Sequence, residues 1–181
     1  MTTPKPRQGG SSLIEVLVTI LILSFGMLSL SAMLAYAVQL PKMSAYRATA
    51  VMLANGHVEK MRANIDGFTA GAYDETMTFN QTITTITPCT YPSCDAGSMA
   101  DKDQYESNLE IRRELPQGGM RMVCNGGSCA SREGDLWVMW QEPSTFAAID
   151  PTAADECPDP TASPTFAFAG QPRCIHIRFK L

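Results

Sequence analysis

The six cysteines are the most evident chemical groups in this sequence, and they fall into three neighbouring pairs. The pairs are Cys89 with Cys94, Cys124 with Cys129, and Cys157 with Cys174. The first two pairs have C-x4-C spacing, which can in principle hold Zn²⁺, although zinc knuckles more often use C-x2-C and the third pair would be left over. We therefore favour three local disulfides in an oxidising compartment, with several connectivities formally allowed.

Groups suited to catalysis are scarce. The chain has two histidines, His57 and His176, and we expect structural or surface roles for both. It has no nucleophile elbow, no zinc-protease helix motif, no phosphate-binding glycine loop and no C-x-x-C redox pair. Two acidic stretches, residues 95–106 and 150–159, do not match EF-hand spacing, so we expect solvated loop acids there. The sequence predicts no enzyme, no cofactor and no metal site.

Glu15 stands apart because it is the single charged residue between Leu13 and Val38, a stretch of 26 residues without proline. An ionised carboxylate inside a membrane segment costs about 2.5–3.5 kcal/mol, so such residues usually have a partner. A second interpretation is that residues 12–15 form an S-x-x-E capping box, in which Glu15 closes the start of a helix. The two interpretations are compatible.

The element that carries Glu15 is predicted to be a membrane-spanning helix. As a helix, 26 residues extend roughly 39 Å, and the apolar core of a bilayer is about 30 Å thick. Lys5 and Arg7 precede the segment, so the positive-inside rule places the N-terminus in the cytoplasm and the rest outside. An uncleaved signal anchor and a signal peptide cleaved after Ala37, which would release a domain starting at Val38, are alternatives.

A second helical pattern follows Pro41. One face of this amphipathic stretch carries residues spaced by three and four, namely Tyr46, Ala50, Leu53, His57 and Met61. Together the two stretches predict one helix from Ser12 to Asn64, roughly 80 Å long. Its second half is expected to lie half-buried on a folded domain.

The remainder of the chain, residues 65–181, reads as a small sheet with disulfide-tied loops. We expect strands at residues 75–87, 119–124, 134–142 and 174–181, a helix at 101–115, and an exposed loop at 143–172. In the last strand Ile175, Ile177 and Phe179 alternate with charged residues, which is typical of a half-solvated antiparallel strand.

Length and charge exclude several classes of function. The chain has 181 residues, 45% of them apolar and only 18% charged, with a net charge of −4. That length suits one domain with an extension, and the composition excludes a disordered chain. Because the acids outnumber the bases and no basic stripe is present, nucleic acid is not an expected partner.

The segment Gly9-Gly10-Ser11-Ser12-Leu13-Ile14-Glu15 resembles the cleavage region of type IV prepilins. In that family a prepilin peptidase cuts after the glycine and the new amino group is methylated. The resemblance implies a cut between Gly10 and Ser11, although the family usually has Phe or Met where this chain has Ser11. It also implies that Glu15 pairs with the terminal amine of a neighbouring subunit, an amine that is largely protonated at neutral pH.

Four further segments resemble the PilV-type minor pilins, the type IV pilus modification proteins. They are Tyr46-Arg47-Ala48, Met61-Arg62-Ala63-Asn64, Leu115-Pro116-Gln117-Gly118-Gly119 and Leu136-Trp137-Val138-Met139-Trp140. The resemblance implies an α+β type IV pilin fold, in which a long N-terminal helix packs on a small antiparallel sheet. It further implies a leader at residues 1–10, a transmembrane and filament-core half-helix at 11–40, and a half-helix plus periplasmic head at 41–181.

The expected function is that of a structural subunit in pilus assembly and priming, placed at the pilus tip. The implied partners are prepilin peptidase, other minor and major pilins and the inner membrane, with the protein later reaching the cell-surface pilus. One alternative is a type II secretion minor pseudopilin, which shares the leader and the helix. The other is a secreted periplasmic binding or enzymatic domain released after Ala37.

Overall fold

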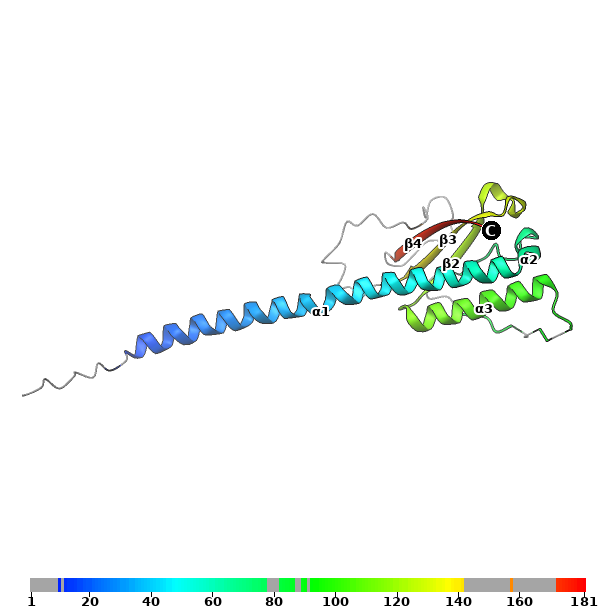
Figure 1. Cartoon of the computed structure of the whole chain (residues 1–181). Helices are drawn as coiled ribbons and strands as arrows, with labels where there is room; N and C mark the ends of the chain where they lie inside the picture. Colours follow the sequence, from blue (N-terminus) through cyan, green and yellow to red (C-terminus); the bar gives the residue numbers. More distant parts are fainter. Residues whose placement is uncertain are drawn as a thin grey trace, which may run out of the picture. The chain divides into compact units, whose positions relative to one another are not determined.

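The computed structural model describes residues 10, 12–77, 82–86, 89–90, 92–141, 157 and 172–181. The helices are α1 (Leu13–Ala63), α2 (Ile65–Thr69) and α3 (Ala96–Glu114), and the strands are β1 (Thr76–Met77), β2 (Gly119–Cys124), β3 (Glu133–Trp140) and β4 (Arg173–Lys180) (Figure 1). Short 3₁₀ turns lie at Asn125–Gly127 and Cys129–Ser131. The chain divides into two compact units, Met1–Lys42 and Met43–Leu181.

Helix α1 confirms the long helix predicted from the periodicity. It runs from Leu13 to Ala63 and contains Pro41. Its last turn carries Lys60 and Arg62, and positive charge at a helix C-terminus is favourable to the helix dipole. The two apolar patterns therefore belong to one continuous helix.

The sheet is antiparallel, with strand order β1-β2-β3-β4. Leu136 and Val138 of β3 and Phe179 of β4 face the core. On β4 the predicted alternation is confirmed, because Phe179 is buried while Arg178 and Lys180 are exposed. The sheet therefore has one face on the main core, while its other face carries polar side chains and a small separate cluster of buried Met139 and Cys174.

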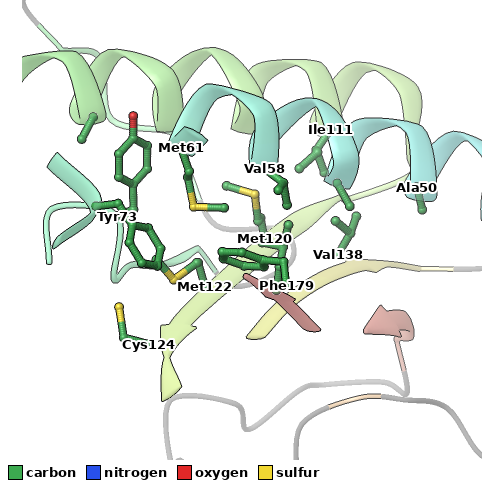
Figure 2. Close-up of a cluster of buried hydrophobic side chains, with 14 of the residues drawn as sticks. Ala50, Val58, Met61, Tyr73, Ile111, Met120, Met122, Cys124, Val138 and Phe179 are labelled. Atoms are coloured by element: carbon green, nitrogen blue, oxygen red, sulfur yellow. The ribbon is translucent and has the colours of Figure 1, made fainter. Parts of the chain in front are cut away.

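One hydrophobic core joins α1 after Lys42, α3 and the sheet. Figure 2 shows side chains from α1 directed toward side chains of the strands, and Ile111 of α3 lies beside them. The buried members include Ala50, Ala54, Val58, Met61, Phe68, Tyr73, Ile111, Leu115, Met120, Met122, Leu136, Val138, Trp140 and Phe179. The second unit is therefore a folded head with its own interior.

Side-chain caps explain two differences from the predicted helices: an earlier start of α3 and the presence of α2. Helix α3 begins at Ala96, five residues before the predicted start, because the Asp95 carboxylate accepts a hydrogen bond from the Ser98 amide at 2.6 Å. Helix α2 was not expected. Its N-cap Asn64 accepts a hydrogen bond from the Gly67 amide at 3.3 Å.

The first strand was predicted too long. Among the described residues of the predicted range, Thr76–Met77 forms a strand paired with β2, the Glu75 carbonyl accepts a hydrogen bond from the Met122 amide, and residues 82–86 are not in a strand. Phe79, part of the predicted alternation, lies outside the described residues. The same holds for the predicted loop at 143–172, apart from Cys157 and Pro172.

Candidate functional site

The helix segment Leu13–Val38 exposes its large apolar side chains on all sides. Leu13 is 85% exposed and Met33 is 71% exposed, and even Val18 is 46% exposed. No residue from 12 to 38 is buried. This segment therefore makes no hydrophobic core within its own unit.

Such exposure cannot persist in water. Burying one large apolar side chain contributes about 1.5–3 kcal/mol, and this segment leaves many of them uncovered. The helix is long and apolar enough to cross a membrane, with a mean hydropathy of 2.4 in its best window, and none of that window is buried. A core helix of a soluble protein would be mostly buried. The segment thus fits a lipid or multi-helix environment.

Three hydroxyl groups inside the apolar segment are satisfied by the helix itself. Thr19 donates to the Val16 carbonyl at 2.8 Å. Ser24 and Ser31 donate to carbonyls one turn earlier, at 2.7 and 2.8 Å. These hydroxyl groups can enter an apolar environment without an outside partner. The one charged residue of the segment, Glu15, cannot be satisfied in this way by a backbone carbonyl.

Glu15 lies in the first turn of α1, beside the glycine of the predicted cut. The backbone amide of Glu15 donates to the Ser12 carbonyl at 2.9 Å. A carboxylate at a helix N-terminus is favourable to the helix dipole, and positive charge from a cleaved terminus would arise at the same end. Ser11 lies outside the described residues.

Gly10 has no structural requirement within the described chain. A Cβ atom added at this position would meet nothing within 4 Å, and Gly10 itself is exposed and lies outside the helix. Packing therefore does not explain a glycine here.

The structure contains three disulfides, and each joins two cysteines that follow one another in the order of cysteines along the chain. They are Cys89–Cys94, Cys124–Cys129 and Cys157–Cys174. Asp74 has a carboxylate oxygen within 4.8 Å of the Cys124 and Cys129 sulfurs. Those two sulfurs are bonded to each other, so this group does not provide the thiolates that zinc requires. The disulfide interpretation is confirmed.

His57 is a structural residue of the core. It is 1% exposed, its Nδ1 lies 3.0 Å from the Ser107 hydroxyl, and its ring packs edge-to-face against Tyr73. Burial, together with the positive charge of Lys60, lowers the pKa of His57 from 6.5 to about 3. The ring is therefore neutral at ordinary pH and has no access to a substrate.

His176 lies on the outer face of the sheet. Its Nε2 is 2.7 Å from the Asp135 carboxylate, and its ring stacks on Trp137 at 4.7 Å between centroids. Arg178 donates to the same carboxylate at 2.9 Å. Burial raises the pKa of Asp135, but the hydrogen bonds from Arg178 and His176 outweigh it, so the net shift is downward. His176 thus belongs to a cross-strand ion-pair network.

Two family models match the chain. A model described as Prokaryotic N-terminal methylation motif matches residues 5–31, and one described as Type IV pilin Tt1218 matches residues 32–105. No curated protein and no solved structure matches significantly. The long helix, the antiparallel sheet and the disulfides form a type IV pilin fold, and the two family-model matches support the type IV pilin superfamily.

The methylation motif spans Gly10, Ser11 and Glu15. The matched type IV pilin family is a family of structural subunits, and the methylation motif implies processing by prepilin peptidase and assembly with other pilins. The apolar helix is consistent with anchoring in a membrane before the pilus forms.

Sequence patterns gave no sign of one further feature, a cavity of about 320 Å³ beside α3. Glu75 and Asp101 lie 26 positions apart in sequence and both line it, together with Asn108. Asp101 was grouped with the solvated acids of residues 95–106. Helical spacing places Asp101 and Asn108 on one face of α3, but no signal in the linear sequence brings Glu75 to them.

Proposed function

We propose that this chain is a minor pilin of the PilV type, made as a membrane precursor and matured by a cut between Gly10 and Ser11. The N-terminus lies in the cytoplasm and the head in the periplasm. The mature, methylated subunit then leaves the inner membrane for a type IV pilus, where it helps to prime assembly at the tip. The observation that carries this proposal is the unburied apolar segment of α1 with its single acid in the first turn.

The cut creates a positively charged group that can pair with Glu15. Cleavage after Gly10 creates an amine on Ser11, four residues before Glu15. Within one subunit this amine adds positive charge to the helix end, and between subunits it can pair with the Glu15 carboxylate of a neighbour. Such a pair repays the cost of a charge in an apolar environment only when both partners are present.

Assembly with similar helices covers the apolar segment outside lipid. A head-to-tail contact that does not close generates a helical filament. Gly26 supports close helix packing, because nothing lies within 4 Å of its Cβ position and a mid-helix glycine costs about 1 kcal/mol relative to alanine. Close contact with another helix in the filament would explain this glycine, whereas no contact within the single subunit explains it.

The two compact units, Met1–Lys42 and Met43–Leu181, support a division of function between the two parts of the chain. Residues 11–40 form the filament core, and residues 41–181 combine a half-helix with a head that presents surfaces to other subunits. The segments Met61–Asn64 and Leu115–Gly119 support the PilV assignment over a type II secretion pseudopilin, which shares the leader and the apolar helix. Deletion of the gene separates these two functions, since loss of surface pili with intact protein secretion supports the pilin and the reverse contradicts it.

Mass spectrometry of the mature N-terminus tests the processing step. We expect a methylated Ser11. Met1 would indicate an uncleaved anchor, and Val38 would indicate a secreted domain, so either result contradicts the proposal.

A glycine variant sharpens that test. Gly10→Arg should leave the full-length precursor in the inner membrane. Gly56→Arg is the matched control, because Gly56 is also exposed with open space at its Cβ position, and it should be processed normally. Normal processing of Gly10→Arg would refute the assigned cut.

A further inference from the structure

The cavity beside α3 lies in the head and has a volume of about 320 Å³. Its walls come from residues in the segments 72–75 and 82–86 and from one face of α3. This volume is at the lower end of ligand sites, which suits a single side chain or a small molecule.

All charged side chains that line the cavity are acidic. They are Asp74, Glu75 and Asp101, and the described lining contains no Lys, Arg or His. Glu75 and Asp101 both remain exposed on one side, and partial desolvation of Glu75 together with the negative charge of Asp101 raises the pKa of Glu75. Among the described residues, neither Glu75 nor Asp101 forms an ion pair. A bound cation would relieve this repulsion.

Asn108 gives independent evidence that the cavity lacks a hydrogen-bond donor. The residue is 5% exposed and lines the cavity, yet its Oδ1 accepts no hydrogen bond. A buried acceptor without a partner costs about 1–3 kcal/mol. The side-chain amide of Gln104, one helical turn before Asn108, donates a hydrogen bond to the Ala72 carbonyl at 3.1 Å. This bond fixes one wall of the cavity. The unpaired oxygen requires a hydrogen-bond donor.

Apolar and aromatic side chains complete the lining. Ile83, Ile86 and Tyr105 are each partly buried at its wall. Such surfaces cover the methylene stem of a long basic side chain, whose charged end then reaches the polar groups. A tyrosine ring adds a favourable face for a cation.

The spacing of the acids favours an organic cation over a metal ion. Ca²⁺ gathers six to eight oxygens at about 2.3–2.6 Å. Among the described residues, the one group of three ligand atoms within 4.8 Å joins Asp74 to the disulfide-bonded Cys124 and Cys129, and it includes neither Glu75 nor Asp101. A guanidinium group is planar and carries five donors, so it spans acceptors that are farther apart.

We propose that this cavity binds a guanidinium group presented by an arginine side chain of a partner polypeptide. The Glu75 and Asp101 carboxylates and the Asn108 Oδ1 receive its N–H donors, and Ile83, Ile86 and Tyr105 cover its stem. Free arginine offers the same group, but its α-carboxylate would be repelled by the three acids. The site uses no residue of the leader or of α1, so its failure would leave the proposed pilin function untouched.

Calorimetry on the full mature chain in detergent micelles tests the chemistry of the ligand. The probes are N-acetyl-arginine amide, its neutral citrulline counterpart and free arginine. We expect saturable binding of N-acetyl-arginine amide, weaker binding of free arginine and none of the citrulline compound. Equal binding of the citrulline compound would overturn the guanidinium assignment, and tighter binding of free arginine would overturn the polypeptide source.

Variants locate the site. Glu75→Gln and Asp101→Asn should each weaken binding of N-acetyl-arginine amide by about tenfold, the effect of losing one charged hydrogen bond. Neither change threatens the fold, because each removes a like-charge repulsion. Glu110→Gln is the matched control, since this exposed acid of α3 does not line the cavity, and it should bind normally. Unchanged affinity in both cavity variants, or an equal loss in the control, would refute the site.

Discussion

The two units of this chain use the same helix in opposite ways. Between Met43 and Ala63, α1 buries Ala50, Ala54 and Met61 completely. Between Leu13 and Val38 the same helix buries nothing. The head therefore carries its partners within the chain, whereas the first unit has an apolar surface suited to partners that the chain itself does not supply.

The sequence encodes this difference in the distribution of polar residues. The head part of α1 is amphipathic, and its charged residues, such as Arg47 and Glu59, are exposed. The first part is apolar all round, which is typical of a helix surrounded by lipid or by other helices. A change on α1 should thus have an effect that depends on which unit it falls in.

The largest effect is expected from Glu15→Val. The variant should insert in the membrane normally, but the terminal amine of a neighbouring subunit would lose its partner. Breaking a buried ion pair costs about 3–5 kcal/mol, so incorporation into pili should fall about a hundredfold or more. Immunoblots of sheared pili and membranes measure this. Glu59→Val, in the head part of the same helix, is the control and should assemble; wild-type incorporation of Glu15→Val would show that the pair is dispensable.

A pair of methionines compares the two units directly. Met61 is fully buried and Met33 is 71% exposed. Met61→Ala should lower the free energy of unfolding of the head by about 2–5 kcal/mol, and Met33→Ala should change it by less than about 0.5 kcal/mol. Urea unfolding in detergent, followed by the fluorescence of Trp137 and Trp140, reports on the head. Similar losses for both variants would contradict the division into units.

Acid should destabilise the head through His57. The folded-state pKa is about 3 and the ordinary value is 6.5. The unfolded chain therefore binds more protons in this window, and stability falls as the pH drops below about 6.5. One pKa unit corresponds to about 1.4 kcal/mol, so the loss at pH 5 is about 2 kcal/mol. The unfolding free energy of His57→Gln should depend less on pH between 7 and 5; an unchanged slope would remove His57 as the cause.

The smallest effect concerns a surface ion pair on the outer face of the sheet. Lys180 donates to the Glu133 carboxylate at 2.8 Å, and its side chain is 71% exposed. Lys180→Ala should cost no more than about 1 kcal/mol, and less at high salt. Urea unfolding at low and high salt checks both statements. A larger loss of unfolding free energy that salt does not reduce would contradict this, because it would mean that the ion pair is shielded from solvent.

Regular patterns were enough to predict the main elements. The apolar run and the three-four spacing predicted α1 to within one residue at each end, and β2 was predicted at its observed bounds. These features are local, since they depend on periodicity along one segment. Capping was harder to foresee. The Asp95 cap overrides the low helix propensity of Gly97 and Ser98, so α3 starts earlier than its apolar spacing indicated.

Long-range contacts explain what the sequence did not reveal. Glu15 and Gly10 could be singled out because their neighbours in sequence carry the signal. In the cavity, Asp101 and Asn108 lie seven residues apart on one face of α3, but only tertiary packing brings Glu75 to them. The burial of His57 followed from the helix face, but its contact with Ser107 joins segments 50 residues apart.

Photo-crosslinking from within α1 tests the central claim most directly. A photoreactive amino acid at Leu23, which is 60% exposed in the apolar segment, is introduced in living cells that make pili. We predict that this chain is present in sheared surface pili and that it crosslinks there to other pilin subunits. Absence from the sheared pili, with crosslinks to lipid alone in the membrane fraction, would contradict the account.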